Sequence, residues 1–176
     1  MCSSRKSRLA LLFLILTCMV GCDQTSKHIA RAKLGHLGAV ALPGGFGELR
    51  LADNPGSFLS LGASLPDWLR LALFTFVVGA GLIVLFAFLA GSSRLRWISF
   101  LGFALVWAGG TSNLIDRITQ QGFVTDFVLL RVGPLHTGVF NVADFLILIG
   151  IASIFWSFGK RGGQHDPEQT TERAKR

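Results

Sequence analysis

Two aspartates in apolar surroundings are the residues of this sequence best suited to acid–base chemistry. Asp126 lies in the stretch from Gly122 to Leu130, and Asp144 stands directly before the apolar run from Phe145 to Gly159. A carboxylate near hydrocarbon is costly unless it faces a protein interior or a wet cavity, so these two residues indicate a functional site.

Two carboxyl groups that come close together in an apolar setting cannot both ionise easily, and one of them keeps a proton. The charged member of such a pair can accept a proton from water. The protonated member can polarise an amide carbonyl and later protonate the leaving amine. Asp126 and Asp144 therefore predict hydrolysis of an amide by an activated water.

Metal-dependent and serine-dependent hydrolysis have less support. The sequence contains no His-Glu-x-x-His motif, and its four histidines are spread without ligand spacing, so we expect neither a metal nor another cofactor. A pair of Lys27 with Ser26 or Ser57 is an alternative. However, adjacent helical residues point apart, and nothing marks either serine as an activated nucleophile.

The composition indicates an integral membrane protein, because 51% of the residues are apolar and only 15% are charged, against roughly 25% charged in soluble domains. Runs long enough to span a bilayer predict a mainly α fold, a single domain over 1–159 with four transmembrane helices. The helices are predicted at about 9–29, 68–91, 96–117 and 139–159.

The remaining segments are predicted from their Gly, Pro and charge content. Residues 30–67 are rich in Gly with short β-like pieces, and they predict a small external β-rich region. Residues 122–130 read as a strand or an extended segment. Residues 160–176 are polar and charged, which predicts a disordered cytoplasmic tail.

The basic residues predict the orientation of the helices. Although the net charge is +7, the basic residues form no continuous face, so we attribute them to membrane topology and expect no nucleic-acid partner. Ten of the seventeen Lys and Arg residues lie before residue 9, at positions 94 and 96, or after residue 159. This asymmetry predicts that both termini face the cytoplasm.

This topology brings the polar ends of three predicted helices to one external face. Within each helix these residues are spaced so that they lie on one side. They are Asp23 and Lys27 of the first helix, Asn113, Asp116 and Arg117 of the third, and Asn141 and Asp144 of the fourth. For four of them the alternative is a structural ion pair, Asp23 with Lys27 or Asp116 with Arg117.

Five motifs follow one another within the four-helix chain. They are Asp23-Gln24-Thr25-Ser26-Lys27, Asn54-Pro55-Gly56-Ser57-Phe58, Gly109-Gly110-Thr111-Ser112-Asn113-Leu114-Ile115-Asp116-Arg117, Val124-Thr125-Asp126-Phe127 and Phe140-Asn141-Val142-Ala143-Asp144. In type and order these motifs resemble those of the lipoprotein signal peptidases (signal peptidase II), which are membrane aspartyl proteases. The resemblance extends from about Arg8 to Phe158.

The resemblance implies a reaction and its residues. Asp126 and Asp144 would form the catalytic dyad, and the substrate would be a prolipoprotein cleaved just before its diacylglyceryl-modified cysteine. The supporting residues implied are Asp23, Lys27, Asn54, Asn113, Asp116, Arg117 and Asn141.

The resemblance also implies a multi-pass protein of the bacterial inner membrane, with the site near the outer leaflet. Residues 30–67 would form a β-rich cradle there. We expect contacts with membrane lipids, a monomer, and inhibition by cyclic peptides.

Two positions depart from the family pattern. The turn after Asn54 is one small residue shorter than usual before Phe58, and Pro55 stiffens it. Ser112 stands where the family usually has Gly, which alters how closely helices can pack.

Two other functions stay open at this point. The residues from Arg5 to Cys22 resemble a lipoprotein signal peptide, which would make the chain a substrate lipidated on Cys22. A transporter could use Asp116, Asp126 and Asp144 as an ion path, although these acids cluster at one face without a ladder across the membrane.

Overall fold

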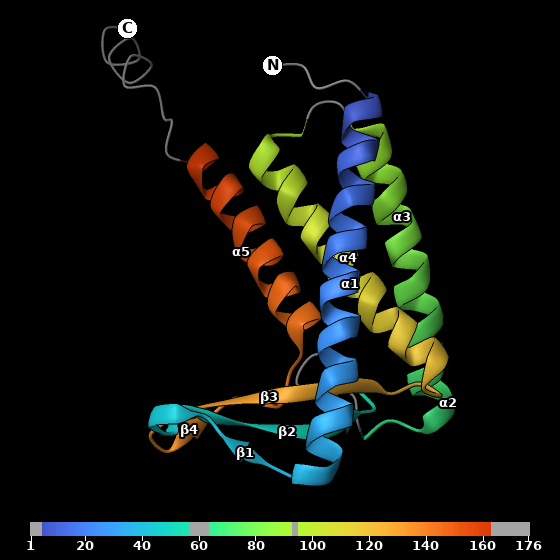
Figure 1. The fold of residues 1–176 in the computed structure, drawn as a ribbon. Helices are drawn as coiled ribbons and strands as arrows, with labels where there is room; N and C mark the ends of the chain where they lie inside the picture. Colours follow the sequence, from blue (N-terminus) through green and yellow to red (C-terminus); the bar gives the residue numbers. More distant parts are fainter. Residues whose placement is uncertain (1–4, 57–63, 93–94, 163–176) are drawn as a thin grey trace, which may run out of the picture.

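The computed structural model describes residues 5–56, 64–92 and 95–162. Within these residues, four helical segments long and apolar enough to cross a membrane lie side by side, and a small sheet covers one end of the bundle (Figure 1). The first, third and fourth segments are α1 (Arg5–Leu37), α4 (Trp97–Thr119) and α5 (Val142–Gly162). The second segment is continuous and consists of α2 (Asp67–Leu71), the π-helical η3 (Ala72–Val77) and α3 (Val78–Gly91). The predicted fold class is confirmed.

Glycines bring α4 and α5 into close contact. A Cβ atom added at Gly102 would lie 2.7 Å from the carbonyl oxygen of Gly150, and one added at Gly109 would lie 2.7 Å from that of Ala143. Small residues let helix backbones approach each other in membranes, where van der Waals packing drives association. Gly109 therefore allows the first turn of α5 to lie directly against α4.

The first helix is longer than the prediction of about 9–29, because α1 continues to Leu37. Residues 30–37 are therefore helical and not part of the β-rich region. Ala30 and Leu34 are one turn apart and pack against Phe127 of the sheet, which stabilises the extension. The helix ends at Leu37 and is followed by Gly38, whose φ of 70° suits glycine and whose N–H donates to the carbonyl of Leu34.

The sheet is antiparallel in the order β1-β2-β3-β4. Its strands are β1 (Val40–Ala41), β2 (Gly47–Asn54), β3 (Val124–Val132) and β4 (Leu135–His136). The β-rich region was predicted between the first two helices, but β3 and β4 come from the segment between α4 and α5. Ala52 is paired with Asp126, so Asn54, two residues further on, shares the face of Asp126.

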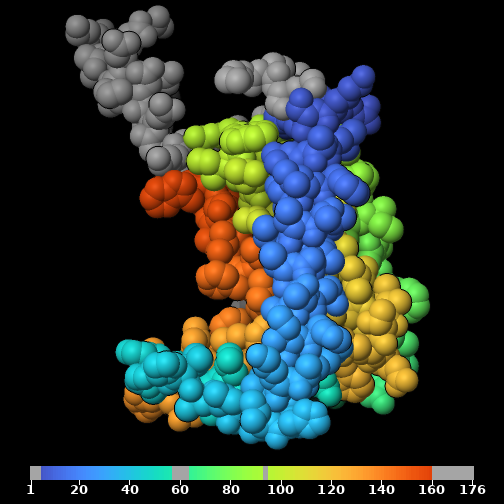
Figure 2. Space-filling view, in the orientation of Figure 1, coloured from blue at the N-terminus to red at the C-terminus, as the bar shows by residue number. Residues whose placement is uncertain are grey.

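The last helix begins three residues later than predicted, at Val142, because Phe140 forms a β-bridge with Val128. It continues to Gly162, and residues 163–176 of the predicted tail lie outside the described residues. The sheet extends sideways beyond the start of α5, and the molecule is hollowed between the two (Figure 2).

Candidate active site

Asp126 is a buried carboxylate of β3, and amide groups occupy both of its oxygens. Its side chain is 1% exposed. Oδ2 accepts a hydrogen bond of 2.8 Å from Nδ2 of Asn54, at the end of β2, and Oδ1 accepts one of 2.6 Å from Nδ2 of Asn141. Strand pairing and the chain entering α5 thus fix this acid from two sides.

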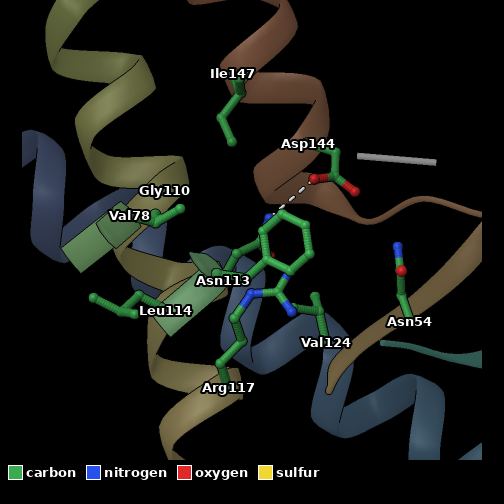
Figure 3. Close-up of a pocket in the computed structure, with 10 residues that line it drawn as sticks. Asn54, Val78, Gly110, Asn113, Leu114, Arg117, Val124, Asp144 and Ile147 are labelled. Atoms are coloured by element: carbon green, nitrogen blue, oxygen red, sulfur yellow. Dashed lines mark hydrogen bonds between the residues drawn. The ribbon is translucent and has the colours of Figure 1, made fainter. Parts of the chain in front are cut away.

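Asp144 lies in the first turn of α5, where the helix dipole favours negative charge. Oδ1 accepts a hydrogen bond of 2.9 Å from Nδ2 of Asn113 on α4, drawn as the dashed line in Figure 3. Its backbone N–H donates to Oδ1 of Asn141 at 2.9 Å, and its Oδ2 accepts from the backbone N–H of Asn141 at 3.4 Å. Asp144 is therefore held by the side chain of Asn113 on α4 and by Asn141, the residue that precedes α5.

Burial, and after it the nearby charge of Asp144, raise the pKa of Asp126 to about 7. The hydrogen bonds from Asn54 and Asn141 act in the opposite direction, since they favour the charged form, but they do not cancel the first two effects. Near neutral pH, Asp126 therefore exchanges between its protonated and charged forms. This is the protonation expected of a pair of acids that shares a proton.

A buried ion cluster lies beside the two acids. Nζ of Lys27 is 2.6 Å from Oδ2 of Asp23 and 2.9 Å from Oδ2 of Asp116, and all three side chains are at most 1% exposed. Lys27 also donates to Oδ1 of Asn113 at 2.9 Å. The predicted pair Asp23–Lys27 is present. The alternative pairing of Asp116 with Arg117 is wrong, because adjacent residues on a helix point apart and Asp116 instead faces α1.

Arg117 contacts backbone carbonyls on both sides of the site. One terminal nitrogen donates to the carbonyl of Gly56 at 2.5 Å and the other to that of Gly122 at 3.0 Å. Its guanidinium lies 5.3 Å from the ring centre of Phe74, a distance at which a cation and an aromatic face attract each other. Arg117 thus ties the end of β2 and the turn before β3 to the second helical segment.

A cavity of about 150 Å³ opens beside Asp144. Figure 3 shows the side chains of Asn113, Arg117 and Asp144 directed into it, with Asn54 at one side. The rest of the wall is apolar and comes from the membrane helices: Phe74, Val78, Gly110, Leu114 and Ile147, with Val124 from β3. The cavity therefore joins a polar floor to an apolar wall, as a site for an amphiphilic chain requires.

Comparison with known proteins supplies the family. The family model described as signal peptidase (SPase) II matches residues 15–159. The chain belongs to the signal peptidase II family. The chain is 35% identical over 167 residues to the lipoprotein signal peptidase of Xanthomonas oryzae pv. oryzae. The match covers 92% of this chain and 98% of the relative.

More distant relatives agree. The lipoprotein signal peptidase of Moorella thermoacetica is 32% identical over 160 residues, 89% of this chain and 98% of the relative. Two solved structures of bacterial membrane enzymes share the fold, each at 22% identity. One has a TM-score of 0.74 and covers 90% of this chain and 93% of that one; the other has a TM-score of 0.71, with 85% and 92%.

Membership of this family shows that the chain is a protease and a multi-pass bacterial membrane protein. The family therefore favours the protease over the transporter alternative. Within residues 5–56, 64–92 and 95–162, no three His, Cys, Asp or Glu side chains are grouped to hold a metal ion. That the protein works without a metal stays a prediction. Of the alternative nucleophiles, Ser26 donates its hydroxyl to the carbonyl of Asp23, and Ser57 lies outside the described residues.

Two polar residues of this candidate site were missed in the sequence. Nε2 of Gln24 donates to Oδ1 of Asp116 at 2.8 Å, and the backbone N–H of Thr125 donates to its Oδ2 at 3.1 Å. The hydroxyl of Thr125 also contacts Arg31 and Gln120. Both residues stand next to predicted site residues and inside two of the five motifs, and either signal could have marked them.

Proposed function

We propose that this chain is an aspartic endopeptidase that removes signal peptides by cleaving just before the diacylglyceryl-modified cysteine of a prolipoprotein. One observation carries the proposal. Two buried carboxyl groups from separate elements, Asp126 of β3 and Asp144 of α5, are both hydrogen-bonded to Asn141. A buried pair of acids that shares a proton is suited to activate water and to polarise an amide carbonyl.

In the proposed reaction, the charged acid accepts a proton from water as the water oxygen attacks the scissile carbonyl carbon. The protonated acid donates a hydrogen bond to the carbonyl oxygen, and a proton then passes to the leaving amine as the carbon–nitrogen bond breaks. The products are the carboxylate of the signal peptide and the free amino group of the lipidated cysteine. The raised pKa of Asp126 supports a pair that holds one proton at neutral pH.

The supporting residues have distinct proposed roles. Asn54, Asn113 and Asn141 orient the two acids through the hydrogen bonds described above. Arg117 shapes the cavity by fixing its two flanking backbone segments. The buried cluster of Asp23, Lys27 and Asp116 holds α1 against α4.

The apolar wall of the cavity supports a substrate that reaches the site from the lipid. Phe74 and Val78 belong to a membrane-capable helix, so an apolar signal peptide and the acyl chains of the modified cysteine could lie along this wall while the scissile bond reaches Asp144. We infer that the sheet end faces the outer leaflet. The opposite end, where α1 begins and α5 ends (Figure 1), would then face the cytoplasm of the cell.

The direct test is incubation of the purified protein with a diacylglyceryl-modified precursor and with the same precursor lacking the lipid. Mass spectrometry should find a new amino terminus at the lipidated cysteine, and only in the first sample. A chelator should leave the rate unchanged. Intact-mass analysis of the cellular protein tests the alternative in which the chain is itself a lipoprotein, since loss of residues 1–21 would contradict the proposed enzyme. That it acts as a monomer, contacts lipids and is blocked by cyclic peptides stay predictions.

A further inference from the structure

A buried serine of α4 contacts the Asp23 carboxylate of α1, a member of the ion cluster. Ser112 is 1% exposed, and its hydroxyl donates to Oδ2 of Asp23 at 2.7 Å. The same hydroxyl accepts a hydrogen bond of 3.1 Å from Nε2 of Gln24. Lys27 contacts the same oxygen of Asp23 at 2.6 Å. One oxygen of the Asp23 carboxylate is therefore fixed by two donors, of which only the lysine is charged.

The other oxygen of Asp23 reaches the helix that carries Asp144. Oδ1 accepts a hydrogen bond of 2.8 Å from the backbone N–H of Ala143, the second residue of α5. The N–H groups of a first helical turn have no partner within the helix, and a negative charge at this end also interacts favourably with the helix dipole. Asp23 thus binds the backbone one residue before Asp144.

Steric contact fixes the same turn from a second direction. The space beside Gly109 is filled by the carbonyl oxygen of Ala143, which would lie 2.7 Å from an added Cβ atom. Gly109 and Ser112 are three residues apart and lie on one side of α4. The first turn of α5 is therefore pressed against α4 at Gly109 and held by Asp23, whose orientation depends on Ser112.

We propose that Ser112 is a positioning residue for the reaction, which fixes the Asp23 carboxylate and through it the first turn of α5 and Asp144. The inference rests on the proposed function of Asp126 and Asp144. Ser112 touches neither acid in the hydrogen bonds described, so its effect on turnover passes through Asp23 and Ala143. A hydroxyl bound to a carboxylate in a buried site is a charge-assisted contact, stronger than a neutral one.

The test compares Ser112→Ala with Ser99→Ala in cleavage of a diacylglyceryl-modified precursor. Ser99 is also a buried serine of α4, bound to the hydroxyl of Ser157, and its loss should leave kcat unchanged. Ser112→Ala should lower kcat per folded protein about 10-fold, the order expected for one hydrogen bond to a charged group, with KM unchanged. The alkaline limb of its pH profile should move to lower pH, because a looser pair of acids repels less.

A double-mutant cycle with Asp23→Asn separates positioning from general packing. If Ser112 acts through Asp23, its loss should have little further effect in the Asp23→Asn background. Three results would each overturn the proposal. The first is additive losses of kcat in the double variant, and the second is a wild-type kcat in Ser112→Ala. The third is a loss of activity in proportion to the amount of folded protein, with an unchanged pH profile.

Asp126→Asn in the same assay tests the underlying function. Cleavage by this variant would contradict the proposed mechanism, and the inference with it. An inactive Asp126→Asn beside a fully active Ser112→Ala would contradict only the positioning role.

Discussion

The side-chain nitrogen of Asn141 lies 2.6 Å from Oδ1 of Asp126. The oxygen of the same amide accepts the backbone N–H of Asp144 at 2.9 Å. The amide of Asn141 thus contacts the carboxylate of Asp126 and the helical turn that carries Asp144. The orientation of this single side chain therefore sets the position of the two acids relative to each other.

Loss of this amide should lower turnover more than it lowers folded protein. We expect Asn141→Ala to reduce kcat by about 10- to 100-fold. The change removes a hydrogen bond to the carboxylate of Asp126, worth about a factor of ten or more, and a second one from the backbone N–H of Asp144. Asn54→Ala and Asn113→Ala each remove one such bond and should have smaller effects. The measurement is kcat divided by the folded fraction from size-exclusion chromatography. Losses proportional to the folded fraction would assign the three residues to packing.

Cleavage should fall as the pH rises through about 7. The pKa of Asp126 is raised to about 7 by burial and by the charge of Asp144, so below this pH the pair holds its proton and above it the proton is lost. Two charged acids cannot polarise the carbonyl, and the rate should therefore decrease on the alkaline side. Rates at saturating substrate between pH 5 and 9 test this, and a rate that keeps rising above pH 8 would contradict it.

The sequence predicted the membrane helices and the positions of the two acids because both depend on local composition. Runs of about 20 apolar residues predict spans, and Asp144 was marked by its position directly before the apolar run from Phe145 to Gly159. The spacing of Asn141 and Asp144 placed both at the start of α5, where they bind each other.

Contacts between distant segments could not be predicted in the same way. Asp116 pairs with Lys27, across two helices, whereas sequence proximity favoured Arg117. β3 completes the sheet by pairing with β2. These strands are far apart in the sequence, so their register is set only when the chain folds. The extension of α1 to Leu37 likewise depends on packing of Ala30 and Leu34 against Phe127, which no local pattern indicates.

A methyl group at Gly109 should displace the first turn of α5. An added Cβ would lie 2.7 Å from the carbonyl oxygen of Ala143, so the backbone that carries Asp144 must move, and even small displacements at a reacting group cost rate. We expect Gly109→Ala to lower kcat by about 100-fold. Gly81→Ala is the matched control, because an added Cβ there meets nothing within 4 Å. Equal activity of the two variants would show that the α4–α5 contact does not set the site.

Cysteine labelling in cells should find the sheet outside. In a background without Cys2, Cys18 and Cys22, we expect Arg50→Cys, on a partly exposed side chain of β2, to react with an impermeant maleimide. Arg5→Cys, at the start of α1, should react only after the membrane is opened, because basic residues favour the cytoplasmic side. The reverse pattern would invert the proposed orientation and place the site at the inner leaflet.

The two acids should be required individually. Asp126→Asn and Asp144→Asn are close to isosteric, so the cavity and the hydrogen-bonded amides should largely survive, and the variants should still insert into membranes and bind lipidated precursor. An amide can neither accept the proton of the attacking water nor donate an acid proton, so the loss of cleavage should reach the upper part of the about 100- to 10,000-fold range of acid–base catalysis. Asp67→Asn, at a carboxylate that is 93% exposed and paired with Arg70, makes the same chemical change away from the site and should cleave at the wild-type rate. Either acid variant that kept more than about a tenth of wild-type turnover, well above the range for an essential acid or base, would contradict the aspartic mechanism at these two residues.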